Sequence, residues 1–269
     1  MNRFYLELIA ICLICFSTLV SAACDNNDNE ISSGNKCTKI KTYKSTELTD
    51  EPILVIVLHG DSPFKKPGYQ YEFAKKVALN NTNVVTIGML RPGYTDPMNR
   101  TSDGEKGEAI GDSYDKKRVD QIAQAIIQLK ENYSPSKVIL AGHSGGSAIT
   151  ANIMSLYPLL IDHAFMVSCP CDVNTWRKDM LALSKKPIFQ GDIETLSPLD
   201  LVELLNESAV ISMFVGKNDR ITKPYISENY KRAVTEKGAK VTLQIIDGKH
   251  DIFLNPLILD AMTDIIESY

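Results

Sequence analysis

A serine with glycine neighbours lies in the segment Gly142-His143-Ser144-Gly145-Gly146, where an apolar run gives way to a helix-like pattern. The spacing Gly-x-Ser-x-Gly is typical of a nucleophile elbow, a sharp strand-to-helix turn that holds a serine hydroxyl at the edge of a sheet. Such a turn crowds its neighbours, so the residues two before and two after the serine must be small, as Gly142 and Gly146 are. Because the bare pattern also occurs by chance, an ordinary glycine-rich turn is the alternative interpretation.

A serine hydroxyl is a weak nucleophile at neutral pH and needs a base, together with an acid that orients the base. Asp219 and His250 each follow an apolar, strand-like run, and they come after the serine in the chain order Ser, Asp, His that this kind of triad uses on an α/β sheet. We therefore predict that His250 takes the proton of Ser144 and that Asp219 orients the histidine ring. Asp172, which follows another strand-like run, is the rival acid.

Acyl transfer by a serine also needs hydrogen-bond donors for the negatively charged oxygen of the tetrahedral intermediate. The predicted donors are the backbone N–H groups of Gly145, directly after the serine, and of Asp61, just after the first strong strand-like run. The carboxylate of Asp61 is a puzzle, because it would repel that charge. Either Asp61-Ser62-Pro63 caps a turn with the side chain directed away, or the carboxylate faces the cleft and binds a cation of the substrate.

Six apolar runs, rich in leucine and β-branched residues, are typical of strands buried on both faces of a parallel sheet. The runs are 53–58, 84–90, 138–141, 164–168, 210–215 and 241–246. Between them lie helix-like segments, such as the one in which Val119, Ile122, Ile126 and Leu129 recur at helical spacing. Strands that alternate with helices predict the α/β class, with a mostly parallel central sheet flanked by helices.

Two stretches depart from this alternation. Residues 23–50 are polar and predict a loosely held N-terminal arm, with an edge strand around 38–43. Residues 172–208 hold two short helix-like pieces between two predicted strands, so we expect a small helical cap, or lid, over the carboxyl edge of the sheet, where such sheets bind ligands. The main α/β domain, which includes the cap, spans 51–269.

The first 22 residues are typical of a secretory signal peptide, with a basic start, an apolar run over 8–20 and the small-residue cleavage pattern Val20-Ser21-Ala22. The apolar run is shorter than the roughly 18 to 20 residues that a membrane-spanning helix needs. We therefore predict export to the periplasm or secretion. Cys24 follows the cleavage site, so a lipoprotein is the alternative, and only a lipidated Cys24 would attach the protein to a membrane.

After removal of the signal peptide the chain keeps four cysteines, Cys24, Cys37, Cys169 and Cys171, and an oxidising compartment allows three ways of pairing them. The spacings of cysteine and histidine match no zinc template, so we predict neither a metal nor another cofactor. The formal net charge is −4 and the lysines and arginines are scattered, which argues against a nucleic-acid partner.

The elbow, the turn at His59-Gly60, Asp219 and His250 together resemble the α/β-hydrolase superfamily over residues 52–269. Arg91-Pro92-Gly93-Tyr94 is similar to a turn that follows an early strand in many of these enzymes. The resemblance implies the α/β-hydrolase fold. It also implies a serine hydrolase that cleaves a carboxylic ester through an acyl-enzyme.

The segment Ser168-Cys169-Pro170-Cys171-Asp172, followed by Trp176-Arg177, resembles exported bacterial hydrolases grouped near the prolyl oligopeptidases. A serine peptidase or amidase acting on small peptides is therefore the alternative enzyme, and the expected partner is a small ester or a short peptide. Because one fold hosts many functions, a non-catalytic binding protein is the alternative from another class.

Overall fold

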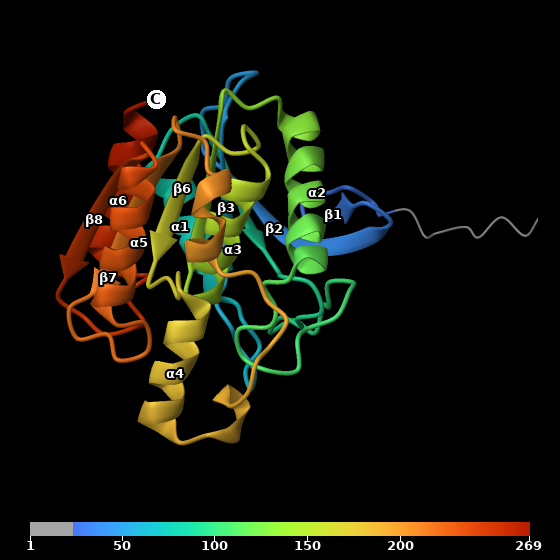
Figure 1. Ribbon diagram of the computed structural model, residues 1–269. Coiled ribbons are helices and arrows are strands. Elements are labelled where there is room, and N and C mark those ends of the chain that lie inside the picture. Colours follow the sequence, from blue (N-terminus) through green and yellow to red (C-terminus); the bar gives the residue numbers. More distant parts are fainter. Residues whose placement is uncertain (1–23) are drawn as a thin grey trace, which may run out of the picture.

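Within the described residues, 24–269, a mixed eight-stranded sheet runs through the centre of the protein (Figure 1). The predicted signal peptide at 1–22 lies outside the residues that this computed structural model describes. In spatial order the strands are β1 (Glu30–Ser33), β2 (Lys36–Lys44), β4 (Val84–Met89), β3 (Ile53–Leu58), β5 (Lys137–His143), β6 (His163–Val167), β7 (Val210–Gly216) and β8 (Lys240–Ile246). The strands from β3 to β8 run parallel to one another, which confirms the predicted mostly parallel sheet of the α/β class.

Helices cover both faces of the sheet, and alternate side chains of β3 enter a different hydrophobic core on each face. Every residue of β3 is buried, as its unbroken apolar sequence predicts. The helices of one core include α2 (Lys116–Tyr133), α3 (Gly145–Leu156) and α5 (Pro224–Glu236), and the start of α4 (Val173–Ser184) also packs into it. Those of the other core are α1 (Tyr69–Asn80) and α6 (Pro256–Glu267).

The polar N-terminal segment belongs to the sheet. β1 and β2 form an antiparallel hairpin, and β2 pairs antiparallel with β4. Ile31 and Ile40 are buried in the core, and a disulfide joins Cys24 to Cys37. The sequence predicts an edge strand near 38–43 within a loosely held arm. The structure holds this segment more firmly, because paired strands, two buried isoleucines and a disulfide fix it.

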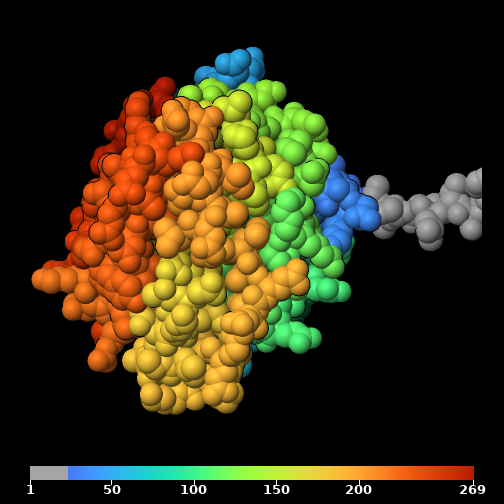
Figure 2. Space-filling model, in the orientation of Figure 1, coloured from blue at the N-terminus to red at the C-terminus, as the bar shows by residue number. Residues whose placement is uncertain are grey.

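The insertion expected to form a cap divides into two parts. α4 (Val173–Ser184) and the short 3-10 helix η1 (Pro187–Phe189) lie beyond the carboxyl ends of the strands, at the lower end of the molecule in Figures 1 and 2. A second 3-10 helix, η2 (Pro198–Leu204), packs instead against α3 and α5. Only α4 and η1 therefore occupy the position of a lid, and the lid role stays a prediction.

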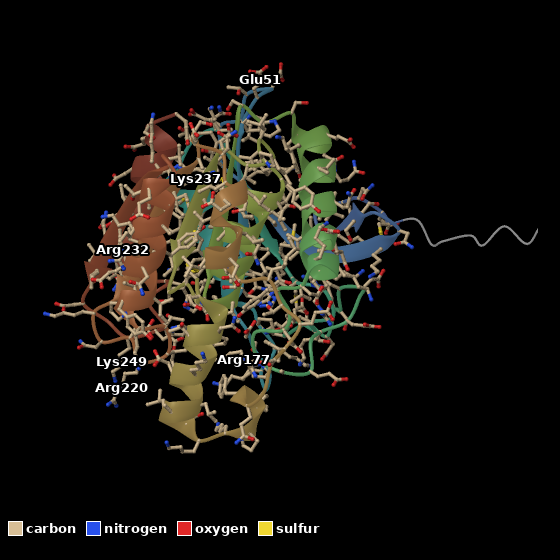
Figure 3. The ribbon with its side chains drawn as sticks, viewed as in Figure 1. Glu51, Arg177, Arg220, Arg232, Lys237 and Lys249 are labelled. Atoms are coloured by element: carbon tan, nitrogen blue, oxygen red, sulfur yellow. A yellow bond between two sulfur atoms is a disulfide. The ribbon has the colours of Figure 1, made fainter. Side chains whose placement is uncertain are left out.

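Arg177 ties α4 and η1, the segment predicted to be a lid, to the main domain. Arg177 is a buried residue of α4 (Figure 3), and it donates to the backbone carbonyl of Ile110 and to those of Ile188 and Gln190, both at 3.2 Å. Desolvation lowers the pKa of Arg177, and the opposing charge of Asp112 offsets only part of this effect. The fixed fork of guanidinium donors lets one residue hold two separate loops.

The two disulfides among residues 24–269 join cysteines that are close in the sequence, Cys24 with Cys37 and Cys169 with Cys171. The second lies between β6 and α4, at the base of the lid segment, and its two cysteines are buried. In the part of the chain that the structure describes, no helix combines the length and the apolar character needed to cross a bilayer.

Candidate active site

The turn around Ser144 has the geometry of a nucleophile elbow. β5 ends directly before Ser144, α3 begins directly after it, and the serine has φ 53° and ψ −122°, a strained conformation for a residue with a side chain. A Cβ atom at Gly142 would lie 2.4 Å from the backbone carbon of Gly146, and one at Gly146 would lie 2.5 Å from a backbone oxygen of β3. Both positions therefore require glycine, as the sequence pattern predicts.

Ser144, His250 and Asp219 are joined by a continuous chain of hydrogen bonds. Ser144 Oγ lies 3.0 Å from His250 Nε2, and His250 Nδ1 lies 2.9 Å from Asp219 Oδ2. The three residues follow β5, β8 and β7, whose carboxyl ends share one edge of the sheet. Figure 3 shows Arg220 and Lys249, the chain neighbours of Asp219 and His250, projecting close together from that edge.

Four hydrogen bonds hold the buried Asp219 carboxylate, which belongs to a residue only 3% exposed. Oδ1 accepts the N–H groups of Ile221 at 2.8 Å and Thr222 at 2.9 Å, and Oδ2 accepts the Thr222 hydroxyl at 2.8 Å in addition to His250. Burial alone would raise the pKa of Asp219, but the hydrogen bonds from His250 and Thr222 lower it below its ordinary value. Asp219 therefore stays ionised and can stabilise a protonated His250.

Thr222 is a site residue that the sequence analysis did not identify. Its hydroxyl also lies 3.2 Å from His250 Nδ1, so it contacts both Asp219 and His250. The available signal was the turn itself, since an aspartate that accepts N–H groups two and three residues later is a common Asx turn. The rival acid Asp172 has a different role: it accepts the N–H of Thr175 at 3.0 Å and caps α4.

The two backbone N–H groups predicted to bind an oxyanion have no hydrogen-bond acceptor among the described residues 24–269. Gly145 N–H is at the first position of α3, where helix donors are free and the helix dipole favours negative charge. The turn that carries Asp61 lies directly against the serine, because a Cβ atom at Gly60 would be 2.9 Å from Ser144 Cβ.

The peptide group between Gly60 and Asp61 is oriented by His59. The Nε2 atom of His59 accepts the N–H of Arg91 at 3.1 Å, so Nδ1 carries the ring proton and donates to the Gly60 carbonyl at 2.7 Å. Burial lowers the pKa of His59 well below its usual value, so the ring stays neutral. The C=O and N–H of a trans peptide point in opposite directions, so holding the carbonyl fixes the direction of the Asp61 N–H.

The Asp61 carboxylate forms a buried ion pair. Oδ1 accepts from Arg91 Nη1 at 3.0 Å and Oδ2 accepts from the Tyr114 hydroxyl at 2.7 Å, and the side chains of Arg91 and Asp61 are 1% and 10% exposed. A Cβ atom at Gly145 would lie 2.5 Å from Oδ1, so the pair borders the oxyanion site. The Arg91 charge offsets the repulsion between the carboxylate and an oxyanion. The structure thus differs from both sequence interpretations of Asp61, the turn cap and the free site for a substrate cation.

Replacing Asp61 with asparagine is expected to destabilise the protein by about 3 to 5 kcal/mol, because the buried Arg91 charge loses its partner. Turnover should fall equally for neutral and cationic esters, since Arg91 and Tyr114 already occupy the carboxylate. Thermal unfolding and kcat/KM for a matched pair of esters measure the two effects. Arg91→Met added to Asp61→Asn should restore part of the stability. A loss confined to the cationic ester would instead favour substrate recognition by Asp61.

Comparison with known proteins finds solved structures of similar fold. Neither a scan against protein-family models nor a search of curated proteins finds a match. Among solved structures, an esterase from Pyrococcus furiosus is similar with a TM-score of 0.67 and 15% sequence identity, covering 90% of each chain. Est1E from Butyrivibrio proteoclasticus, solved with ferulic acid, is similar with a TM-score of 0.65 and 15% identity, covering 89% of this chain and 96% of that one.

The acylaminoacyl peptidase of Pyrococcus horikoshii is also similar, with a TM-score of 0.63 and 13% identity. The alignment covers 89% of this chain but only 40% of the peptidase. The protein therefore has the α/β-hydrolase fold, as its resemblance to that superfamily implied. No cluster of three or more His, Cys, Asp or Glu side chains suited to a metal ion occurs among residues 24–269.

Proposed function

We propose that the protein is a serine hydrolase that cleaves carboxylic esters through an acyl-enzyme intermediate. Ser144 is the nucleophile, His250 the general base and acid, and Asp219 the residue that orients His250. The observation that carries the proposal is the unbroken chain of hydrogen bonds from Asp219 through His250 to the Ser144 hydroxyl. This hydroxyl lies on a strained turn beside two free N–H groups, an arrangement that simple binding does not require.

The mechanism follows from these positions. Ser144 Oγ attacks the ester carbonyl carbon while His250 Nε2 takes the hydroxyl proton, and the oxyanion accepts the N–H groups of Gly145 and Asp61. The tetrahedral intermediate then breaks its bond to the alcohol oxygen, which receives the proton from His250. Water next attacks the acyl-serine while His250 takes a proton from it. The second tetrahedral intermediate then breaks its bond to Ser144 Oγ, which receives the proton from His250, and the acid is released. Asp219 stabilises the imidazolium in both halves of the reaction.

The similar structures include both esterases and peptidases, and their overall size does not separate the two activities. The esterase from Pyrococcus furiosus and Est1E match this chain over nine-tenths of their own length or more, but so does a proline iminopeptidase from Mycobacterium smegmatis, which is matched over 97% of its length. The same triad cleaves amides when the leaving amine is protonated well, so a peptidase acting on small peptides is the competing outcome of the test below.

We also propose that the protein acts outside the cytoplasm. Two disulfides among the described residues are compatible with an oxidising compartment. Because Cys24 Sγ is bonded to Cys37, the same sulfur is not free to carry a thioether-linked lipid, which supports a released protein over a lipoprotein.

Labelling with a fluorophosphonate probe tests the enzymatic proposal, because the probe phosphonylates only serines activated by a base. Wild-type protein is expected to label and Ser144→Ala is not. Absence of label on the wild type would favour the binding protein. Hydrolysis of p-nitrophenyl esters of graded chain length, measured beside aminoacyl and prolyl amides, then separates an esterase from a peptidase.

A further inference from the structure

His143 lies between Gly142 and Ser144 in the elbow, and the proposed mechanism does not use it. The residue is 5% exposed, and its ring stacks on Phe253 with 5.3 Å between centroids. Both ring nitrogens are engaged: Nδ1 lies 2.9 Å from the Tyr69 hydroxyl, and Nε2 lies 3.1 Å from the backbone carbonyl of His250. A buried histidine with two specific partners in the active site has a fixed orientation.

The direction of each hydrogen bond follows from its partners. A carbonyl oxygen only accepts, so His143 Nε2 carries the ring proton and donates to His250. Nδ1 is then an acceptor, and it receives the hydroxyl proton of Tyr69. The Tyr69 oxygen in turn accepts the backbone N–H of Gly60 at 2.5 Å. One continuous path of donors and acceptors therefore runs from Gly60 through Tyr69 and His143 to His250.

The two ends of this path lie at the two groups that the proposed chemistry must position, the oxyanion turn and the catalytic base. Gly60 precedes the residue whose N–H is aimed at the oxyanion, and its own N–H is occupied by Tyr69, which leaves Asp61 as the free donor. His250 lies in an irregular loop after β8, where its carbonyl also accepts the Ser168 hydroxyl at 3.2 Å and the N–H of Ile252 at 2.9 Å. The base is thus held through its backbone as well as through its ring.

We propose that Tyr69 and His143 are positioning residues whose hydrogen bonds set the place of the oxyanion turn relative to the catalytic histidine. The inference deepens the proposed function and rests on it. A base and an oxyanion donor act on neighbouring atoms of one tetrahedral centre, so an error of about an ångström in their relative position lowers the rate strongly. We call the hydrogen-bonded path through Gly60, Tyr69, His143 and His250 the relay. It connects the oxyanion turn to the catalytic histidine.

The charge state of His143 suits this role. Desolvation, followed by the neighbouring His250, lowers the pKa of His143 to about 3. The ring therefore stays neutral, with its proton on Nε2, through the range near pH 6.5 in which histidines ordinarily titrate. Burial also raises the pKa of Tyr69, so its hydroxyl keeps the proton that it donates.

Steady-state kinetics of Tyr69→Phe test the relay. We expect kcat to fall about 10- to 100-fold with KM within about twofold, because the reacting groups are misplaced while binding contacts remain. The matched control is Tyr71→Phe. Tyr71 lies on the same helix as Tyr69, and its hydroxyl donates to Asp96, away from the site. His143→Leu should match Tyr69→Phe, and His143→Gln, which keeps a donor near the Nε2 position, should recover part of kcat. If Tyr69→Phe and Tyr71→Phe behave alike in an active enzyme, the relay is wrong.

Nitrogen NMR of histidine-labelled protein gives a readout that does not depend on turnover. The chain has four histidines, so single substitutions assign them. Wild-type His143 is expected to show the Nε2–H tautomer from about pH 5 to pH 8, and Tyr69→Phe should lose that fixed tautomer. An Nδ1–H tautomer in the wild type would overturn the relay. An inactive wild type with the expected tautomer would instead overturn the proposed hydrolysis and leave the hydrogen-bond path standing.

Discussion

Replacing His250 with alanine is expected to lower kcat for a p-nitrophenyl ester about a millionfold, as losses of a triad base do in other serine hydrolases. The reason is the 3.0 Å contact between His250 Nε2 and Ser144 Oγ, since no other side chain among residues 24–269 is hydrogen-bonded to that hydroxyl. Ser144→Ala should cost about as much. Because the serine and histidine act as a unit, the double variant is expected to be no slower than either single variant.

Two comparisons make this prediction decisive. Lys249→Ala changes the residue directly before His250. Lys249 is exposed and projects into solvent in Figure 3, so kcat should stay within about twofold. A small residual rate above the uncatalysed reaction is expected in every triad variant, because the oxyanion donors remain. Losses that multiply in the double variant would show that Ser144 and His250 act independently, which the hydrogen-bonded geometry does not permit.

The parallel core of the fold could be predicted because strands buried on both faces leave an unbroken apolar signature. β3 has the predicted bounds 53–58, and β4 to β8 begin and end within a few residues of the predicted runs. The prediction of burial on both faces is wrong for β8, because it is the last strand of the sheet and none of its residues is buried. β1 was missed because Glu30–Ser33 has only one buried isoleucine and no apolar run. Its pairing with β2 depends on backbone hydrogen bonds that composition does not report.

The candidate triad could be located because each member follows a strand. A parallel sheet brings the carboxyl ends of its strands to one edge, so Ser144, Asp219 and His250 were expected to meet although 31 or more residues separate each of them from the next. Tyr69 and Tyr114 could not be found in this way. Tyr69 is the first residue of α1 and Tyr114 lies just before α2, and only the packed structure brings them to the elbow and to Asp61.

The Asp61 carboxylate shows the same limit of sequence reasoning. Its interpretation required knowing what neutralises it, and the partner, Arg91, lies 30 residues later in the chain. The Arg-Pro-Gly-Tyr motif pointed to Arg91 as notable but not to its partner. Motifs therefore identify residues with special roles, while the pairing of charges depends on which loops the fold brings together.

Replacing Asp219 with alanine is expected to lower kcat about 10,000-fold, whereas Asp172→Ala should leave kcat within about threefold. Asp219 holds His250 Nδ1 at 2.9 Å, while Asp172 caps α4 through the Thr175 N–H. Loss of that cap should appear as a decrease of about 1 kcal/mol in the free energy of unfolding. Steady-state kinetics and chemical denaturation of the two variants measure both quantities, and the reverse pattern would reassign the acid to Asp172.

Asparagine at the two positions sharpens the comparison, because it keeps the size of aspartate while it removes the charge and replaces one acceptor oxygen with an N–H donor. In Asp219→Asn the new side chain would present an amide N–H to His250 Nδ1, so the ring would place its own proton on Nε2 and could no longer accept the proton of Ser144. Asp219→Asn should therefore be almost as slow as Asp219→Ala. Asp172→Asn should change neither kcat nor the free energy of unfolding appreciably, since asparagine caps helices as well as aspartate does. An active Asp219→Asn enzyme would mean that His250 does not use its Nε2 atom as the base.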